Sequence, residues 1–256
     1  FDKRGNIAAT SQSNNTVPMN DNRIAMEKEL RFYGSTSRDF AVVKTGASNM
    51  MMKWKRGNSE SYVNLFSFDN AGTFTSTKSQ RVTVSSYGYT DLIKGPGNLF
   101  ISAEQGYKRR NNVNRWGLLI STISTDSKDD VHVVDTERMT QNVNDNNNSY
   151  YRSPSITALN DSIYAIGYRG DSYDGFIETF KVETSGKITR LKSYEYDVNE
   201  SNYNKLVRVD DNTVAMIYRG FKGQWGGHVL TFDIATDGSS ITEVASKLLH
   251  NSGDFF

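Results

Sequence analysis

Short hydrophobic runs separated by tight polar turns dominate the chain. Residues 156–170 hold two such runs on either side of Asn160 and Asp161, and both the pattern and a closing Tyr-Arg-Gly recur in residues 206–220 around Asp210 to Asn212. Asn, Asp and Gly in such turns supply the backbone geometry that two-strand hairpins require. A period of about fifty residues therefore predicts a tandem repeat of antiparallel strands.

Each repeat is predicted to contain four strands. The first two lie in residues 30–46, 92–106, 156–170 and 206–220, with the first of these hairpins turning at Gly34 to Thr36. A third strand ends near a Phe, in residues 62–68, 117–123, 175–180 and 227–232. The fourth strand alternates between apolar and polar residues, as in 188–194 and 241–248, which indicates an outer strand with one solvated face.

Four-stranded antiparallel units in tandem favour an all-β fold, a β-propeller of four-stranded blades. We expect one propeller region over residues 1–256, with a partial repeat at 1–17 and complete repeats at 28–84, 90–140, 154–198 and 204–250. A β-sandwich and a β-solenoid are the alternatives. One partial repeat beside four complete ones can be explained in three ways. The chain is a piece of a larger propeller, it is a complete small propeller, or a neighbouring chain supplies strands to an open sheet edge.

Two groups of residues resemble known propeller families. The turns from Phe68 to Gly72 and from Phe1 to Gly5 resemble degenerate Asp-box turns of sialidase-type propellers, with Phe74 where the pattern has Trp. The Tyr-Arg-Gly repeat resembles tandem propeller repeats of large microbial surface proteins. The Asp-box resemblance implies the fold, and it concerns a turn on the side away from the usual binding face.

Composition narrows the class of protein further. The net charge of +1 carries no general signature of a nucleic-acid binder, and the absence of cysteine excludes disulfides and thiolate metal sites. No stretch approaches the roughly 18 apolar residues of a membrane helix. Abundant Asn, Ser, Thr and Tyr lead us to expect an extracellular or cell-surface protein without a membrane partner.

The sequence contains no recognisable metal or cofactor motif. The histidines, His132, His228 and His250, are scattered rather than arranged at metal-ligand spacing. The acidic or amide-rich turns at Asp129 and at residues 145–148 lack the spacing of an EF-hand loop, so calcium is conceivable there without a supporting motif. We expect no cofactor.

Candidate ligand-binding residues gather after the second strand of each repeat. In a propeller the loops from strand two to strand three share one face with the connections between blades, and ligands usually bind there. We predict that these loops carry the binding residues Trp54, Lys55, Arg56, Tyr107, Arg109, Arg115, Trp116, Tyr168, Arg169, Tyr218, Arg219 and Trp225. Aromatic faces stack on sugar rings and arginine forks bind carboxylate or sulfate, so the set fits an acidic glycan.

Several interpretations of this set remain open. The repeated Tyr-Arg pairs, Tyr168 with Arg169 and Tyr218 with Arg219, equally fit packing between blades. Single-stranded nucleic acid uses the same stacking and charge, but the near-neutral net charge argues against it. We expect a lectin-like adhesion module that binds an acidic cell-surface polysaccharide. The alternatives are a polysaccharide lyase or glycosidase, for which no catalytic set can be assembled, and a structural surface or filament subunit whose open ends pair with other chains or further blades.

Overall fold

The computed structural model describes residues 38–56, 60–69, 73–83, 86–110, 113–139 and 152–251. Within these ranges the chain forms sixteen β-strands and one short 3-10 turn, η1 (Asp171–Tyr173), with no α-helix. No helix in this part of the chain is long and apolar enough to cross a membrane. The all-β prediction is confirmed.

The strands form four four-stranded antiparallel sheets, each built from consecutive strands, and we call these sheets blades 1 to 4. Blade 1 contains β1 (Arg38–Lys44), β2 (Asn49–Arg56), β3 (Glu60–Phe68) and β4 (Phe74–Thr83). Blade 2 contains β5 (Ser86–Lys94), β6 (Leu99–Arg110), β7 (Val113–Thr125) and β8 (Val131–Met139). Blade 3 contains β9 (Arg152–Ala158), β10 (Ile163–Arg169), β11 (Gly175–Val182) and β12 (Ile188–Asp197). Blade 4 contains β13 (Ser201–Arg208), β14 (Thr213–Phe221), β15 (Trp225–Ile234) and β16 (Ile241–His250).

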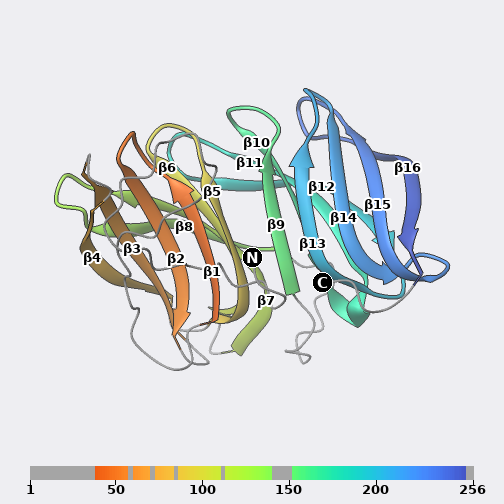
Figure 1. Ribbon diagram of the computed structural model, residues 1–256, viewed down its shortest axis with the longest axis horizontal. Coiled ribbons are helices and arrows are strands. Elements are labelled where there is room, and N and C mark those ends of the chain that lie inside the picture. Colours follow the sequence, from red (N-terminus) through yellow and green to blue (C-terminus); the bar gives the residue numbers. More distant parts are fainter. Residues whose placement is uncertain are drawn as a thin grey trace, which may run out of the picture.

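The blades follow one another around a common axis. The first strands β1, β5, β9 and β13 lie side by side in that order, with blade 1 at one end of the molecule and blade 4 at the other (Figure 1). In the described part of the chain, β13 and β1 do not pack beside each other as the successive inner strands do. The four blades therefore form an arc.

The hydrophobic core lies between consecutive blades. Met51 and Val63 of blade 1 pack with Phe100 and Val131 of blade 2, and further clusters fill the junctions of blades 2 with 3 and 3 with 4. A second strand such as β10 is covered by a blade on each side and is buried at every position, whereas the middle of the outer strand β12 is exposed. The alternating apolar and polar residues of the fourth strand predicted this exposure of the outer strand.

A β-bulge recurs at the same place in every blade. The register between the third and fourth strands shifts at Leu65/Phe66, Thr122/Ile123, Thr179/Phe180 and Thr231/Phe232. In the structure, the residue of blade 1 that is equivalent to Phe180 and Phe232 is therefore Phe66, rather than the predicted Phe68. The Asp-box-like turn that follows lies partly in residues 70–72, which are outside the described residues.

The predicted strand register of blade 1 is wrong. The first strand is β1 rather than a strand beginning at residue 30, and Gly46 lies in the β1–β2 turn, where its N–H donates to the Asn49 carbonyl (3.3 Å). The stretch taken for a loop is strand β2, because Met51 and Lys53 are buried against blade 2. The predicted turn at 34–36 and the partial repeat at 1–17 lie outside the described residues.

Equivalent hydrogen bonds tie blade 2 to blade 3 and blade 3 to blade 4. The Thr122 hydroxyl of blade 2 donates to the Gly186 carbonyl of blade 3 (2.7 Å), and Thr179 of blade 3 donates to the Gly238 carbonyl of blade 4 (2.6 Å). Both threonines precede the shared bulge, so each reaches the hairpin between the third and fourth strands of the next blade. The junction is a repeated polar contact as well as an apolar one.

The inner strands are joined in the same repeated way. Asp91 of β5 accepts the Ile156 N–H of β9 (2.7 Å), and Ser155 of β9 accepts the Leu206 N–H of β13 (3.0 Å). A buried backbone N–H without an acceptor costs free energy, and these side chains supply the acceptor where a sheet ladder cannot. Adjacent blades are therefore joined from the inner to the outer strands.

Candidate functional site

The connections that carry the predicted site meet at one edge of blades 3 and 4. Gly175 at the start of β11 pairs with Arg169 of β10 and with Asp197 of β12. In blade 4 the same edge holds Ser201, which pairs with Gly220 near the end of β14. This edge, formed by residues 169–175, 197–201 and 219–225, is called the upper edge below.

The predicted ligand-binding residues lie on strands rather than on long loops, which corrects the sequence interpretation. Antiparallel pairing continues almost to the tip of each hairpin, where Arg56 pairs with Glu60, Arg110 with Val113 and Phe221 with Trp225. The charged residues of these tips satisfy their backbone groups in the ladder, so polarity alone does not mark a loop. The strands hold Trp54, Lys55 and Arg56 in β2, Tyr107 and Arg109 in β6, Arg115 and Trp116 in β7, Tyr168 and Arg169 in β10, Tyr218 and Arg219 in β14, and Trp225 in β15.

The side chains of five of these residues, Arg56, Tyr107, Arg109, Arg115 and Trp116, lie outside the described part of the structure. Of the remaining blade 1 candidates, Trp54 and Lys55 are both buried. The Trp54 ring stacks on Tyr62 (5.2 Å between centroids), and its indole N–H donates to the Asn64 amide oxygen (2.6 Å). Trp54 thus uses its ring and its N–H inside blade 1.

Tyr168 and Tyr218 are fully buried. Tyr168 stacks on Phe176 (5.8 Å), while Tyr218 stacks on His228 (5.2 Å) and contacts Tyr196 edge-on (4.9 Å). These rings have no surface to offer a ligand, and they pack between strands as the alternative interpretation expects.

The arginines that follow them lie beside aromatic rings. The Arg169 guanidinium lies 4.2 Å from the centroid of the Tyr173 ring, and the Arg219 guanidinium lies 5.6 Å from the centroid of Trp225. Tyr173 is 40% exposed and Trp225 is 38% exposed. Because Arg169 and Arg219 occupy equivalent positions, the upper edge repeats a cation–aromatic pair in consecutive blades.

The two arginines differ in their other contacts. Arg169 is buried and donates from Nη1 to the Asn202 amide oxygen of blade 4 (2.5 Å), and Asn202 in turn donates to Glu200 (2.7 Å). Arg219 is half-buried, and its Nε makes no hydrogen bond in the described structure. Arg169 therefore joins two blades, whereas the Arg219 guanidinium lies beside an exposed indole, with its Nε buried.

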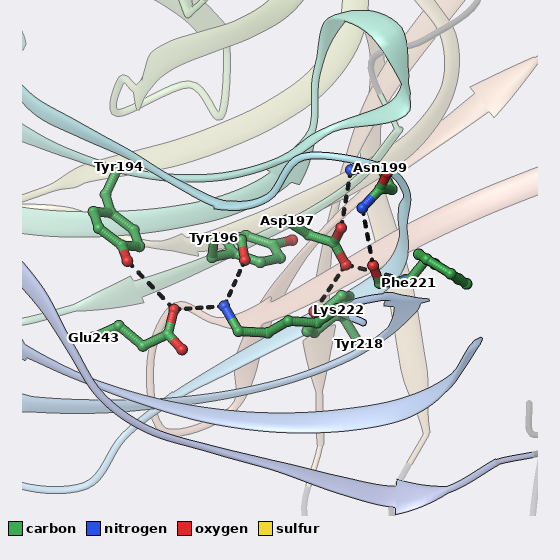
Figure 2. Close-up of polar contacts among 8 residues, drawn as sticks. All are labelled: Tyr194, Tyr196, Asp197, Asn199, Tyr218, Phe221, Lys222 and Glu243. Atoms are coloured by element: carbon green, nitrogen blue, oxygen red, sulfur yellow. Dashed lines mark hydrogen bonds and ion pairs between the residues drawn. The ribbon is translucent and has the colours of Figure 1, made fainter. Parts of the chain in front are cut away.

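A buried carboxylate holds the upper edge in shape (Figure 2). Asp197 accepts the Tyr218 hydroxyl (2.9 Å) and the Phe221 N–H (3.1 Å) on one oxygen, and the Asn199 and Glu200 N–H groups on the other (3.0 and 3.3 Å). Burial, and then the Asp197 charge, raises the pKa of Tyr218 well above its ordinary value, so the hydroxyl keeps its proton and donates. Both carboxylate oxygens are thus occupied.

A second polar group supports the β14–β15 connection (Figure 2). Lys222 donates to the Tyr196 carbonyl (2.8 Å) and forms an ion pair with Glu243 (2.8 Å), and the Tyr194 hydroxyl also reaches Glu243 (3.4 Å). Lys222 and Glu243 belong to blade 4, and the two tyrosines belong to β12 of blade 3. The short tip that carries Trp225 is therefore fastened to the neighbouring blade.

The glycine of the Tyr-Arg-Gly line is required by close approach. A Cβ on Gly220 would lie 2.2 Å from the Glu200 carbonyl oxygen and 2.8 Å from an Asp197 carboxylate oxygen. A Cβ on Gly170 would lie 2.6 Å from the Phe176 ring. The sequence indicated a backbone requirement at this point, and the structure identifies its physical cause in the neighbouring backbone and side chains.

The opposite edge of the blades contains two grooves. One of about 560 Å³ lies between blades 1 and 2, and one of about 950 Å³ lies between blades 2 and 3, with Lys94 and Gly97 lining both. Polar side chains there are engaged in their own turns: Asp126 accepts the Lys128 and Asp130 N–H groups, and Asn160 accepts the Ser162 N–H. These residues have structural roles, so the upper edge remains the better candidate.

The described residues contain no cluster of three or more His, Cys, Asp or Glu side chains that could hold a metal ion. His228 bonds the Gln224 carbonyl (2.9 Å) beneath the upper edge, and His132 lies 3.3 Å from Asp126 on the exposed opposite edge. Sequence reasoning missed Asp197 and Glu243, because a single acidic residue carries no local signal of partners more than twenty residues away.

Comparison with known proteins bears on the fold. No family model and no curated protein sequence matches the chain. Among solved structures, a protein from Lactobacillus plantarum aligns at 10% identity and a TM-score of 0.54, over 84% of this chain and 57% of that chain. Saccharomyces cerevisiae Sqt1 aligns at 8% identity and a TM-score of 0.51, over 83% of this chain and 48% of that chain.

The NanB sialidase of Streptococcus pneumoniae is also similar, at 12% identity and a TM-score of 0.44, over 68% of this chain and 26% of that chain. The chain spans about half the length of the first two proteins. The solved structures that it resembles include β-propeller proteins. With its four sheets in sequence order, this chain has the β-propeller fold.

Proposed function

We propose that this chain is a binding module that holds an acidic carbohydrate at the upper edge of blades 3 and 4. The observation that carries the proposal is the pairing of Arg219 with the exposed Trp225 ring. An indole face can stack on a sugar ring, while a guanidinium beside it binds a carboxylate or sulfate in bidentate fashion.

The equivalent pair in blade 3 extends the surface. Tyr173 exposes 40% of its area and is held by Arg169, whose own Nη1 is engaged by Asn202. Tyr173 therefore contributes stacking, and Arg169 positions it. Repetition of an aromatic platform in adjacent blades suits a polymer with repeated sugar units.

We favour binding over cleavage because two carboxylates at or beside this edge, Asp197 and Glu243, are already engaged. A glycosidase of the usual kind uses two carboxyl groups that face the substrate. Asp197 accepts four hydrogen bonds from protein groups, and Glu243 is paired with Lys222. Both serve the scaffold.

We place this activity outside the cell. The support is the composition, rich in Asn, Ser, Thr and Tyr and free of cysteine, together with the resemblance of the Tyr-Arg-Gly repeat to microbial surface proteins and of the Phe68 turn to Asp-box propellers. Adhesion to an acidic cell-surface polysaccharide is the role that unites these features.

The test is retention on immobilised heparin and polygalacturonate at about 0.15 M salt, where exposed charges are screened beyond roughly 8 Å. The wild type should be retained, and Arg219→Gln combined with Trp225→Ala should reduce retention at least about tenfold, because it removes both stacking and charge. Arg208→Gln is the matched control, because it removes the same charge as Arg219→Gln but at the opposite edge of the blade. An equal loss of retention in both variants would mean that retention depends on net charge alone. A wild type that is not retained would refute the proposal.

A further inference from the structure

The groove between blades 1 and 2 lies at the edge of the blades opposite the upper edge, which is called the lower edge here. Its volume of about 560 Å³ falls within the range of small-molecule sites, roughly 300–1,000 Å³. The β1–β2 turn and the end of β3 line the groove from blade 1, and the β5–β6 and β7–β8 turns line it from blade 2. The groove therefore follows the junction of two blades.

Two side-chain hydrogen bonds tie the corresponding junction of blades 3 and 4. The Asn160 amide in the β9–β10 turn donates to the Thr236 carbonyl (2.8 Å), and the Thr179 hydroxyl donates to the Gly238 carbonyl (2.6 Å). Both acceptors belong to the β15–β16 turn. These bonds fasten the second hairpin turn of blade 4 to blade 3.

Neither bond can form between blades 1 and 2. The first hairpin turns of blades 1 and 3 have the same geometry, since each closes with an N–H donated to the carbonyl four residues later. Gly46 therefore takes the position of Asn160 and has no side-chain amide. Leu65 precedes the shared bulge of blade 1, so it takes the position of Thr179 and has no hydroxyl. The junction stays open where blades 3 and 4 are tied.

The carbonyls that face this open junction lack partners. The β7–β8 and β15–β16 turns each contain an N–H that donates to the carbonyl three residues earlier, which makes Ser127 equivalent to Thr236 and Asp129 equivalent to Gly238. In the described part of the chain, the Ser127 and Asp129 carbonyls accept no hydrogen bond. A hydrogen-bond donor is missing at two places in the groove.

Side chains with unused hydrogen-bonding groups surround these carbonyls. Within the described residues, no side-chain hydrogen bond or ion pair uses the following lining residues: Asn49, Ser67, Lys94, Asn98, Thr125 and Ser127. Amide and hydroxyl side chains each offer a donor and an acceptor. The apolar part of the lining comes from Met50, Leu65, Phe66 and Phe100. An apolar floor with a few convergent polar groups is the usual composition of a small-molecule site.

The charges of the groove favour an uncharged ligand. Lys94 and Asp129 contribute one charge of each sign. Asp126, the remaining charged residue of the lining, accepts the Lys128 and Asp130 N–H groups of its own turn. The groove therefore has no excess of positive charge that would attract an anion.

We propose that this groove is a second ligand site and that it binds a neutral saccharide. Sugar hydroxyl groups donate to the Ser127 and Asp129 carbonyls, in the places that the Asn160 amide and the Thr179 hydroxyl take between blades 3 and 4. The Asn49 and Asn98 amides bond further hydroxyl groups, which are donors and acceptors as well. The proposal is independent of the acidic-carbohydrate site, because no lining residue of the groove lies at the upper edge.

The test is a glycan array that carries neutral and acidic glycans, probed with the full chain and its variants. The wild type should bind neutral glycans. Asn49→Ala combined with Asn98→Ala should lower that binding about tenfold or more, because two groups that hydrogen-bond the sugar are removed. Asn212→Ala is the matched control: Asn212 is an exposed residue of the β13–β14 turn in blade 4, outside the groove, so binding should be unchanged.

Gly46→Asn tests the open junction directly. Its amide should reach the Ser127 carbonyl as the Asn160 amide reaches Thr236, and should therefore exclude the sugar. Gly46→Ala is the control that keeps the groove open, since the atoms nearest to a Cβ at residue 46 lie at 3.6 and 3.7 Å, which are ordinary contact distances. Circular dichroism of each variant checks that the fold is retained. Equal neutral-glycan binding by Gly46→Asn and Gly46→Ala would contradict the role of the open junction.

The same array separates this site from the one at the upper edge. The groove variants should still bind acidic glycans, and Arg219→Gln combined with Trp225→Ala should still bind neutral ones. A wild type that binds only acidic glycans, or neutral-glycan binding that survives Asn49→Ala with Asn98→Ala, would overturn the groove site and leave the upper-edge site standing. Loss of both glycan classes in the folded groove variants would mean one shared site and would also overturn it.

Discussion

Removing the charge of Lys53 should destabilise the protein far more than removing a surface cation. Lys53 and Glu104 form an ion pair between blades 1 and 2 (2.9 Å), and each side chain is only 1% exposed. The Lys53 ammonium also donates to Ser102 (3.0 Å), and Ser61 donates to the second Glu104 oxygen (2.6 Å). The variant Lys53→Met keeps most of the side-chain volume and removes the charge.

The expected cost follows from what the substitution leaves behind. Breaking one partner of a buried ion pair costs about 3–5 kcal/mol, because the remaining charge stays buried and uncompensated. The side chains of the ion pair between Arg208 and Asp211 are 37% and 91% exposed. Because exposed ion pairs contribute little, Arg208→Met should cost less than about 1 kcal/mol. The double variant Lys53→Met/Glu104→Leu should recover most of the loss, since neither charge then remains, although Ser61 and Ser102 lose partners worth about 1 kcal/mol each.

The assay is urea unfolding followed by circular dichroism, with free energies from linear extrapolation. Lys53→Met, Glu104→Leu, the double variant and Arg208→Met are compared with the wild type. A cost below about 1 kcal/mol for Lys53→Met, or strictly additive single and double variants, would refute the reasoning.

Two further predictions concern backbone approach and acid stability. Gly220→Ala should lower the free energy of unfolding by about 1–3 kcal/mol, because its Cβ would lie 2.2 Å from the Glu200 carbonyl oxygen. Gly227→Ala is the control: no atom lies within 4 Å of its Cβ, so it should cost less than about 1 kcal/mol in the same urea assay. The pKa of Asp210 is lowered by N–H groups of its own turn, so its ionised form stabilises the fold above the unfolded pKa and that contribution is lost as pH falls through the folded pKa. A carboxyl carbon NMR titration should place the Asp210 midpoint below that of an unfolded peptide, and an unshifted midpoint would contradict the turn geometry.

Much of the fold could be predicted from local patterns. Asn160 and Asp210 lie in hairpin turns as predicted, and their side chains accept N–H groups of their own turns. The third strands of blades 3 and 4 end near Phe180 and Phe232, as the repeat indicated. Turn chemistry and strand alternation act between residues close in sequence, so the sequence contains that information.

The candidate site was predicted less completely. The sequence predicted that Arg219 and Trp225 lie near each other, and they do, but it placed them on a long loop and treated Tyr218 as a possible ligand contact. Tyr218 is buried because blade 3 covers it and Asp197 accepts its hydroxyl from 21 residues away. A contact of that kind has no local pattern.

The sequence by itself determined that this protein is a series of four-stranded antiparallel blades, because the period, turns and alternation are properties of neighbouring residues. Only the tertiary structure decided which charged residues are buried. Lys53 is one of three cations in a stretch that was interpreted as a loop, and it belongs to a central strand because Glu104, 51 residues later, neutralises it. The same packing between blades decided that Val207 and Ile217 of blade 4 stay exposed, since burial there depends on a neighbour that local sequence does not specify.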